Sequence, residues 1–357
     1  MRPRLVERVS LNRGAFQTKK IDLFCQYVLA HDLAHYIKSL MLDLTFWSAD
    51  PDLNDRFLSI FDAADTLRNV HVNVFRGPSE EALPIWHAVC AHPSFSTLRV
   101  DAWDDTRIPA TVPLHTLHNL HIRVAMSASS QQICDLLCAS AHTLRCLFMC
   151  SVSDLIIPEL LDERHAVFPA LRSIIIEQPV TAAQIVTAFP RLTHLKALCA
   201  IYTEPPAGCR EAVVCPDLKH IKSTPLFLVP FLQNYPMPKS ISEVDVLGPI
   251  TCQDSLDELC QALSGYSVNA LLLRLSIVPG STVFEFGRTM ITLGSLVSSL
   301  ARTLPHLAVL SIQLLSNDDI LSDDSQSVRR ASLFYIKSYS NRMTFPVFRR
   351  RWLTHGL

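Results

Sequence analysis

The sequence predicts an α/β fold made of about eleven repeated units, each with one short parallel strand and one helix or turn. The first observation is a recurring pair of apolar residues, in which the second residue lies three positions after the first. The second is that apolar helical stripes lie between successive copies of this pair. The second residues of the pairs, used as markers, are Leu40, Val70, Leu98, Leu120, Leu147, Ile174, Leu195, Ile221, Val244, Leu271 and Leu310.

The spacing of the markers indicates the type of repeat. Ten intervals separate Leu40 from Leu310, and their mean length is 27 residues. A period of 20 to 29 residues built on L-x-x-L-x-L is the signature of a leucine-rich repeat. A single unit would leave its apolar side in water, so the units are expected to stack. We therefore expect a curved solenoid with parallel strands on the concave face and helices on the convex face.

One unit shows how each element follows from the residues. In residues 181–199, Thr181 is expected to cap a helix whose apolar face includes Ile185 and Phe189. Pro190 should end that helix, because proline has no N–H to donate and its ring clashes with the preceding turn. Leu195 then lies in the strand. The same order is expected in helix–strand pairs at 53–61 and 67–72, 256–263 and 271–275, and 293–300 and 307–312.

Three domains follow from this reading: an N-terminal segment at 1–20, the leucine-rich-repeat solenoid at 21–315, and an acidic loop with a C-terminal cap at 316–357. Residues 21–33 are expected to form the first helix. The regular repeat spacing is expected to be interrupted at a short unit between 98 and 120, at an irregular loop at 200–215, and at extra residues around 279–288.

Composition excludes several classes of protein. The net charge is −1, so no global field would attract nucleic acid or an anionic membrane. No apolar run approaches the roughly 20 residues of a membrane span. The 11 cysteines are scattered and lack a CxxC pair, so reduced thiols are expected rather than a disulfide framework. A cytoplasmic or nuclear protein is the resulting expectation.

The partner-binding surface is predicted from strand alternation. With each marker buried, the residues one before, one after and three after it should point out from the concave face. The predicted surface has polar and basic side chains around an apolar centre, a composition typical of interaction sites. Its candidate residues are His71, Arg99, His121, Arg123, Cys146, Phe148, Ile175, His194, Lys196, His220, Lys222 and Arg274.

No catalytic or metal-binding constellation is recognised, and no cofactor is expected. The sequence has no G-x-S-x-G, H-E-x-x-H, Walker A or G-x-G-x-x-G pattern. His115, His118 and His121 would alternate between faces in a strand, so they do not predict a three-ligand site. The protein is therefore expected not to be an enzyme.

The repeat series resembles the repeat region of the F-box/leucine-rich-repeat proteins of mushroom-type fungi. The segments that carry this resemblance are DLAHYIKSLMLDL at 32–44, FPALRSIII and LPHLAVLSI. The resemblance implies that the repeats bind a substrate protein and that an F-box docks on the Skp adaptor of a cullin–RING ubiquitin ligase. The sequence departs from that family because no F-box helix of the Leu-Pro-x-Glu type is recognised in it.

Three functional hypotheses follow. The first is a protein-interaction scaffold that binds a partner on the concave face, either as the substrate receptor of an SCF-type ubiquitin ligase or as a free-standing repeat protein. The second is a nucleic-acid-binding module, which the neutral net charge disfavours. The third is an enzyme with an unfamiliar site.

Overall fold

The computed structural model places the chain in two compact units, Met1–Gln178 and Pro179–Leu357. It describes residues 6–11, 17–44, 50–75, 80–102, 116–123, 130–150, 154, 156–205, 213–248, 250, 253–277, 283–286, 289–292, 296, 300–316 and 332–337. Within these ranges, side chains are described except at 17, 18, 81, 130, 253, 274–277, 283–292 and 313–337.

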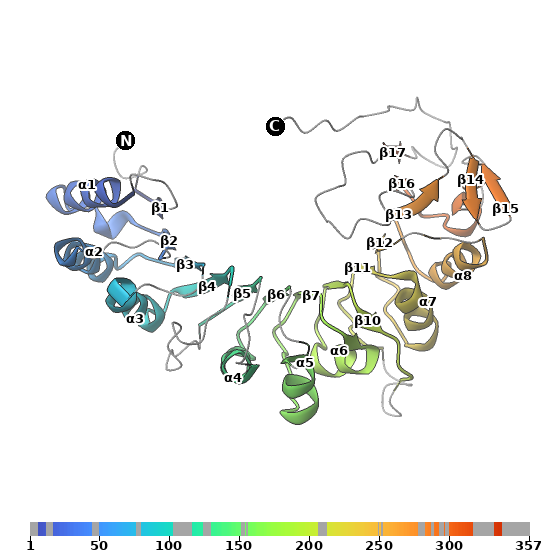
Figure 1. The fold of residues 1–357 in the computed structure, drawn as a ribbon, viewed down its shortest axis with the longest axis horizontal. Helices are drawn as coiled ribbons and strands as arrows, with labels where there is room; N and C mark the ends of the chain where they lie inside the picture. Colours follow the sequence, from blue (N-terminus) through green and yellow to red (C-terminus); the bar gives the residue numbers. More distant parts are fainter. Residues whose placement is uncertain are drawn as a thin grey trace. The chain divides into compact units, whose positions relative to one another are not determined.

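The first unit contains a parallel sheet whose strands follow one another in chain order (Figure 1). Each strand pairs in parallel with the next one along the chain. The strands are β1 (Arg8–Leu11), β2 (Ser39–Asp43), β3 (Asn69–Val74), β4 (Phe95–Val100), β5 (Asn119–Ile122), β6 (Cys146–Met149) and β7 (Ser173–Ile176).

Helices connect these strands and lie on one face of the sheet (Figure 1). They are α1 (Gln17–Ala30), η2 (Ala34–Tyr36), α2 (Pro51–Ala63), η3 (Glu80–Ala82), α3 (Leu83–Ala91), α4 (Ser130–Ser140), α5 (Ile156–Pro158) and η4 (Glu159–Glu163). In α2, the Asp50 side chain accepts hydrogen bonds from the backbone N–H groups of Asp52 and Leu53, at 3.1 and 3.3 Å. This cap satisfies N–H groups that have no partner inside the helix.

The second unit repeats the arrangement in the part of it that the structure describes. Strands β9 (His194–Ala197), β11 (His220–Ser223), β12 (Glu243–Val246), β13 (Ala270–Ile277) and β16 (Val309–Ser316) pair in parallel. Strand β17 (Ser332–Lys337) pairs with β16 in the antiparallel direction. The remaining elements are helices α6 (Ala182–Ala188), α7 (Pro225–Asn234) and α8 (Gln253–Leu263), the short parallel pair β8 (Val180–Thr181) and β10 (Ala200–Ile201), and the hairpin β14 (Val283–Phe286) and β15 (Thr289–Thr292).

The predicted α/β architecture with parallel strands is confirmed. All eleven marker residues lie in strands, and each is at most 4% exposed. Helix α6 also agrees with the sequence prediction: Thr181 and Gln184 form a capping box, and Ile185 and Phe189 are buried. The markers are also direct neighbours across most strand pairs, for example Leu120 opposite Leu147.

Strands β3 and β4 are an exception, because their marker residues are not direct neighbours. Val70 lies opposite Phe95, but His71 lies opposite Thr97, so Ser96 is an extra residue in a β-bulge. The Ser96 hydroxyl donates a hydrogen bond to the Val70 carbonyl at 3.5 Å. The bulge places Leu98 opposite Val72 rather than opposite the marker Val70.

A ladder of hydroxyl groups joins successive repeats of the first unit. The hydroxyls of Ser94, Thr116 and Thr143 donate to backbone carbonyls of the preceding repeat at 2.6, 2.8 and 2.9 Å, and Thr66 makes the same type of contact. These bonds satisfy carbonyls beside the buried sheet, where an unpaired group would be costly. The ladder therefore fastens neighbouring units together.

Strand β1 lies within the predicted N-terminal segment at 1–20 and extends the sheet through pairing with β2. Of the predicted cap at 316–357, the structure describes Ser316 and β17. None of the helices in the described ranges is both long and apolar enough to cross a bilayer.

Candidate functional site

The candidate site of the first unit is the sheet face opposite the helices, which we call free face 1. It comprises His71, Asn73, Thr97, Arg99, Asn119, His121, Cys146, Phe148, Ser173 and Ile175. These side chains are partly or fully exposed, whereas Leu147 and Met149, which alternate with Cys146 and Phe148 in β6, are at most 2% exposed. Strand alternation therefore positions the predicted residues of this unit on one face.

Free face 1 has an apolar centre formed by Cys146, Phe148 and Ile175. Phe148 lies opposite His121 on one side and opposite Ile175 on the other. The rings of His121 and Phe148 are stacked, with centroids 5.5 Å apart and planes 23° from parallel. Each of the three side chains in the centre is only partly buried, so the centre is accessible.

Arginine and amide groups surround this centre. Arg99 lies opposite His121, and its Nε is 3.1 Å from Oδ1 of Asp101. Arg123 follows β5 and is exposed. Asn119 donates from Nδ2 to Oγ1 of Thr97 at 3.0 Å, so this part of the face is already ordered by a bond between neighbouring strands.

Burial controls the protonation of the titratable groups on free face 1. It lowers the pKa of His71 and His121, and the Arg99 charge lowers the pKa of His121 further. Burial also raises the pKa of the Cys146 thiol, against the opposing effect of Arg145. Both imidazoles are therefore neutral and the thiol is protonated near pH 7.

The corresponding surface of the second unit, free face 2, carries the other predicted residues. His194 and Lys196 of β9 lie opposite His220 and Lys222 of β11. The rings of His194 and His220 meet edge to face, with centroids 5.8 Å apart. The backbone of Arg274 lies in β13, and its side chain is outside the described residues.

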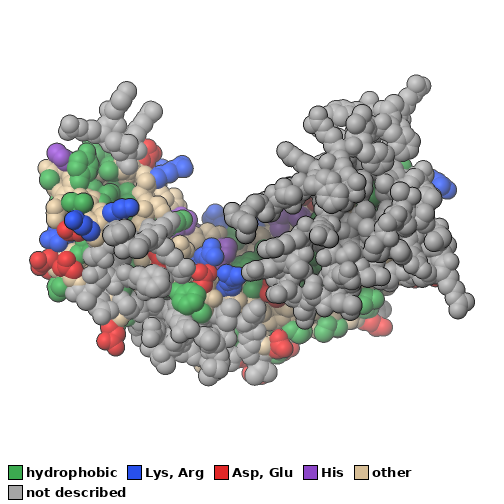
Figure 2. Space-filling model, turned by 45° about the horizontal axis from the view of Figure 1, so that its top comes forward, with side chains coloured by type: hydrophobic (Ala, Val, Ile, Leu, Met, Phe, Trp, Pro, Cys, Tyr) green, Lys and Arg blue, Asp and Glu red, His purple; other side chains and the backbone are tan. Residues whose placement is uncertain are grey.

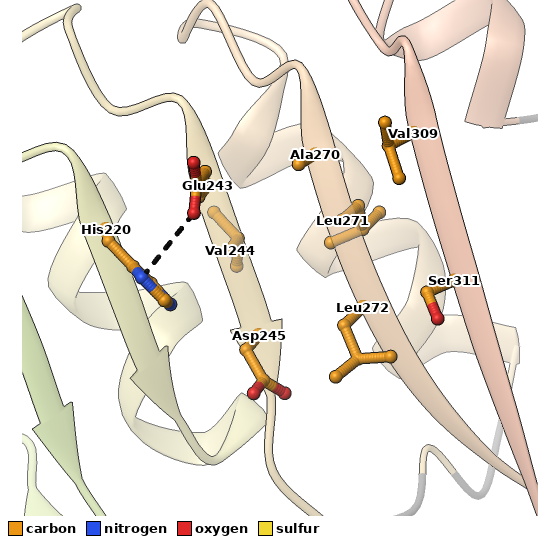
Figure 3. Close-up of a pocket in the computed structure, with 9 residues that line it drawn as sticks. All are labelled: His220, Glu243, Val244, Asp245, Ala270, Leu271, Leu272, Val309 and Ser311. Atoms are coloured by element: carbon orange, nitrogen blue, oxygen red, sulfur yellow. Dashed lines mark ion pairs between the residues drawn. The ribbon is translucent and has the colours of Figure 1, made fainter. Parts of the chain in front are cut away.

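Two carboxylates of β12 join this cluster, and they were not among the predicted site residues. Nδ1 of His220 lies 3.6 Å from Oε2 of Glu243 (Figure 3), and Lys222 forms an ion pair with Asp245. The Lys222 and Asp245 side chains are 24% and 12% exposed, so this pair is largely withdrawn from water. Glu243 and Asp245 flank the marker Val244, so the strand rule itself places them on the same face as the basic residues.

Beside these carboxylates, free face 2 contains a pocket of about 360 Å³. Its lining residues are His220, Glu243, Val244, Asp245, Ala270, Leu271, Leu272, Val309 and Ser311. Figure 3 shows Leu272 and Val309 projecting from β13 and β16 on the side opposite His220. Burial is the main cause of the lowered pKa of His220, and Glu243 partly opposes it.

No group of three His, Cys, Asp or Glu side chains within the described residues is arranged to hold a metal ion. The space-filling view shows Lys, Arg and His side chains beside uncharged polar surface (Figure 2). No protein-family model matches the sequence, and a search of curated proteins finds no match.

Proposed function

We propose that this chain is a leucine-rich-repeat scaffold that binds a protein partner through its free sheet faces. The observation that carries the proposal is the accessible apolar centre of free face 1, surrounded by polar and basic side chains. Protein interfaces combine a partly apolar core with a polar rim, and aromatic residues near the core often contribute most of the binding energy. Phe148 has this position.

The dimensions of the face support the same proposal. Seven strands spaced at about 4.8 Å make a surface roughly 30 Å across in the first unit alone. A surface of this extent suits a polypeptide better than a small metabolite, which usually requires an enclosed cleft. A protonated Cys146 thiol also suits contact more than nucleophilic catalysis, because the thiolate is the nucleophile.

The proposal is tested by replacing the apolar centre in the full chain. Wild type and the Phe148→Ala/Ile175→Ala variant would be tagged at the native locus, and co-purifying proteins quantified by mass spectrometry. A direct partner should decrease at least about tenfold in the variant, because truncation of a central aromatic commonly costs 2 kcal/mol or more. The control is Leu226→Ala, which removes a highly exposed apolar side chain outside free face 1.

Unchanged recovery of every partner in Phe148→Ala/Ile175→Ala would refute the assignment of binding to free face 1. The same experiment tests the role in a ubiquitin ligase, for which the resemblance to F-box/leucine-rich-repeat proteins is the support. Co-purification of a Skp adaptor and a cullin would favour a substrate receptor. Another partner without them would favour a free-standing scaffold.

A further inference from the structure

The pocket of free face 2 arises where one small side chain lies between larger ones. Ala270 of β13 lies opposite Glu243 of β12 on one side and opposite Val309 of β16 on the other. Because neighbouring strands are about 4.8 Å apart, Glu243 and Val309 are separated by roughly 10 Å across the sheet. The Ala270 methyl group is too short to fill this gap, so a pocket of about 360 Å³ remains above it (Figure 3).

The two sides of the pocket differ in chemistry. On one side lie the Glu243 carboxylate and the His220 imidazole, with Nδ1 of His220 3.6 Å from Oε2 of Glu243. On the other side, Leu272 and Val309 present apolar side chains (Figure 3). Ser311, which lies opposite Leu272, adds a hydroxyl group to the lining. A ligand that suits both sides has an apolar stem and a charged or polar end.

The charges around the pocket favour a cationic end. Asp245 also lines the pocket, but it forms an ion pair with Lys222. Glu243 instead lies beside His220, whose pKa is lowered mainly by burial, so this imidazole is neutral near pH 7. Lys196 lies on β9, two strands away from Glu243. The described side chains that line the pocket and Lys222 together carry one excess negative charge, on a Glu243 side chain that is 57% exposed.

An alkyl chain that ends in a cation satisfies both sides of the pocket. The ammonium of a lysine or the guanidinium of an arginine can donate hydrogen bonds to Glu243, while its methylene groups pack on Leu272 and Val309. An anion would be repelled by Glu243 and Asp245. A wholly apolar side chain would cover the Glu243 carboxylate without giving it a partner, and this is costly.

The walls of the pocket indicate that the cation belongs to a polypeptide. All nine lining residues belong to four neighbouring strands, β11, β12, β13 and β16, so no described loop or helix residue closes the pocket. Sites for small molecules usually bury about 70–90% of the ligand surface, and a free amine on this open face would remain much more hydrated. A side chain of a bound protein would be held by further contacts along the rest of the face.

We infer that the pocket of free face 2 binds a lysine or arginine side chain of a partner protein. Glu243 accepts hydrogen bonds from the cationic end of that side chain, and Leu272 and Val309 contact its methylene groups. This inference rests on the proposed function and specifies the chemistry of the partner at the second unit.

The test uses two variants of the full chain that alter the pocket in different ways. Ala270→Leu fills the space above β13, and Glu243→Gln removes the charge while it keeps the shape of the side chain. Glu258→Gln is the control for charge, because it makes the same change at an exposed residue of α8. Ala63→Leu is the control for size, at an exposed position of α2 in the first unit. Circular dichroism would verify that each variant is folded.

The probe is a peptide chosen for binding to the pocket. A random library of ten-residue peptides displayed on phage would be depleted on immobilised Ala270→Leu and then selected on wild type. Because depletion removes peptides that bind elsewhere, the selected peptides should be enriched in Lys or Arg. The tightest peptide, and a copy in which norleucine replaces its basic residue, would be measured against all five proteins by fluorescence polarisation. Competition with n-butylammonium would measure binding of a free amine.

Glu243→Gln and Ala270→Leu should each weaken binding of the basic peptide about tenfold, because one removes a charged hydrogen bond and the other removes the space for the side chain. Both controls should leave binding unchanged. The norleucine peptide should bind wild type about tenfold more weakly than the basic peptide does. Selected peptides without Lys or Arg, no selected peptide, or equal affinity for all five proteins would overturn the inference. Binding of n-butylammonium as tight as that of the peptide would overturn it in favour of a site for free amines.

Co-purification from cells separates this inference from the proposed function. If Phe148→Ala/Ile175→Ala removes a cellular partner while Glu243→Gln and Ala270→Leu retain every partner, binding at free face 1 stands and the pocket inference fails. If Glu243→Gln and Ala270→Leu remove a partner that Phe148→Ala/Ile175→Ala retains, the pocket inference stands and the assignment to free face 1 fails. If none of these variants affects any partner, both fail.

Discussion

The two free faces use the same strand positions and the same basic residue types, but they differ in what lies across the next strand. On free face 1, Arg99 lies opposite His121, and its side chain remains exposed. On free face 2, β12 places Glu243 opposite His220 and Asp245 opposite Lys222. A basic residue in a parallel sheet is therefore a binding group or part of a structural ion pair according to its cross-strand neighbour.

This difference has an energetic basis. A largely buried ion pair gains strong Coulomb attraction but pays for removing both charges from water, so losing one partner leaves an expensive unpaired charge. An exposed pair such as Arg99–Asp101 contributes little, because water and salt screen it. The Lys222–Asp245 ion pair of free face 2 should therefore affect folding, whereas the charges of free face 1 should affect binding.

The largest expected contrast is in stability. Asp245→Asn should reduce the free energy of unfolding by about 3 kcal/mol, because it leaves the Lys222 ammonium largely buried without its carboxylate. Asp101→Asn should reduce it by less than about 1 kcal/mol, because Arg99 remains solvated. Urea unfolding of the full chain, followed by circular dichroism, measures both.

A matched variant identifies the cause of the destabilisation. Lys222→Met/Asp245→Leu removes both charges and should recover most of the stability lost in Asp245→Asn, because no unpaired charge remains. Equal effects of Asp245→Asn and Asp101→Asn would show that the two faces do not differ in this way.

The sequence was a good guide to the strands because burial has a simple local rule. The markers recur with a regular apolar spacing, and each occupies a buried strand position. Alternation then placed His121, Phe148 and Lys222 on the exposed side of their strands, which required no knowledge of neighbouring repeats.

Features that depend on contacts between repeats were not predicted. The Thr143 hydroxyl bonds to the carbonyl of Leu117, 26 residues earlier, and no local pattern specifies that bond. The extra residue at Ser96 changes the register between β3 and β4, although the spacing of its repeat is ordinary. The pairing of Lys222 with Asp245 required the register of two strands, and it changed the interpretation of a predicted basic site.

The second expected contrast is in histidine titration. Arg99→Ala should raise the pKa of His121, because it removes a neighbouring positive charge. Glu243→Gln should lower the pKa of His220, because it removes a carboxylate that stabilises the imidazolium. Asp245 also raises this pKa, whereas His194 and Lys222 lower it. NMR titration of the imidazole protons measures the two shifts, and shifts of the same sign would contradict the contrast.

The same histidines predict the direction of pH dependence. Their pKa values in the folded protein lie below the ordinary value of 6.5, so the unfolded chain binds more protons between the folded and unfolded pKa values. Their contribution to stability is therefore complete above pH 6.5 and is lost as pH falls below it. Urea unfolding should show lower stability at pH 5.5 than at pH 7.5, and His121→Gln should reduce that difference.

The smallest expected contrast is in the rate of thiol modification. It reports directly on which free face a bound partner covers. Cys146 is partly buried in the centre of free face 1 with a raised pKa, whereas Cys199 of the second unit is exposed. Iodoacetamide should therefore modify Cys199 several-fold faster than Cys146, as followed by mass spectrometry. Cys260, which is buried with a pKa raised to about 11, should react only when the chain unfolds.

Binding changes this order in a way that distinguishes the two faces. A partner bound to the apolar centre of free face 1 would cover Cys146 and slow its modification, while Cys199 would react at an unchanged rate. Protection of both thiols would indicate a general tightening of the chain. Protection of Cys199 alone would place the partner on the second unit, and it would contradict binding at the apolar centre of free face 1.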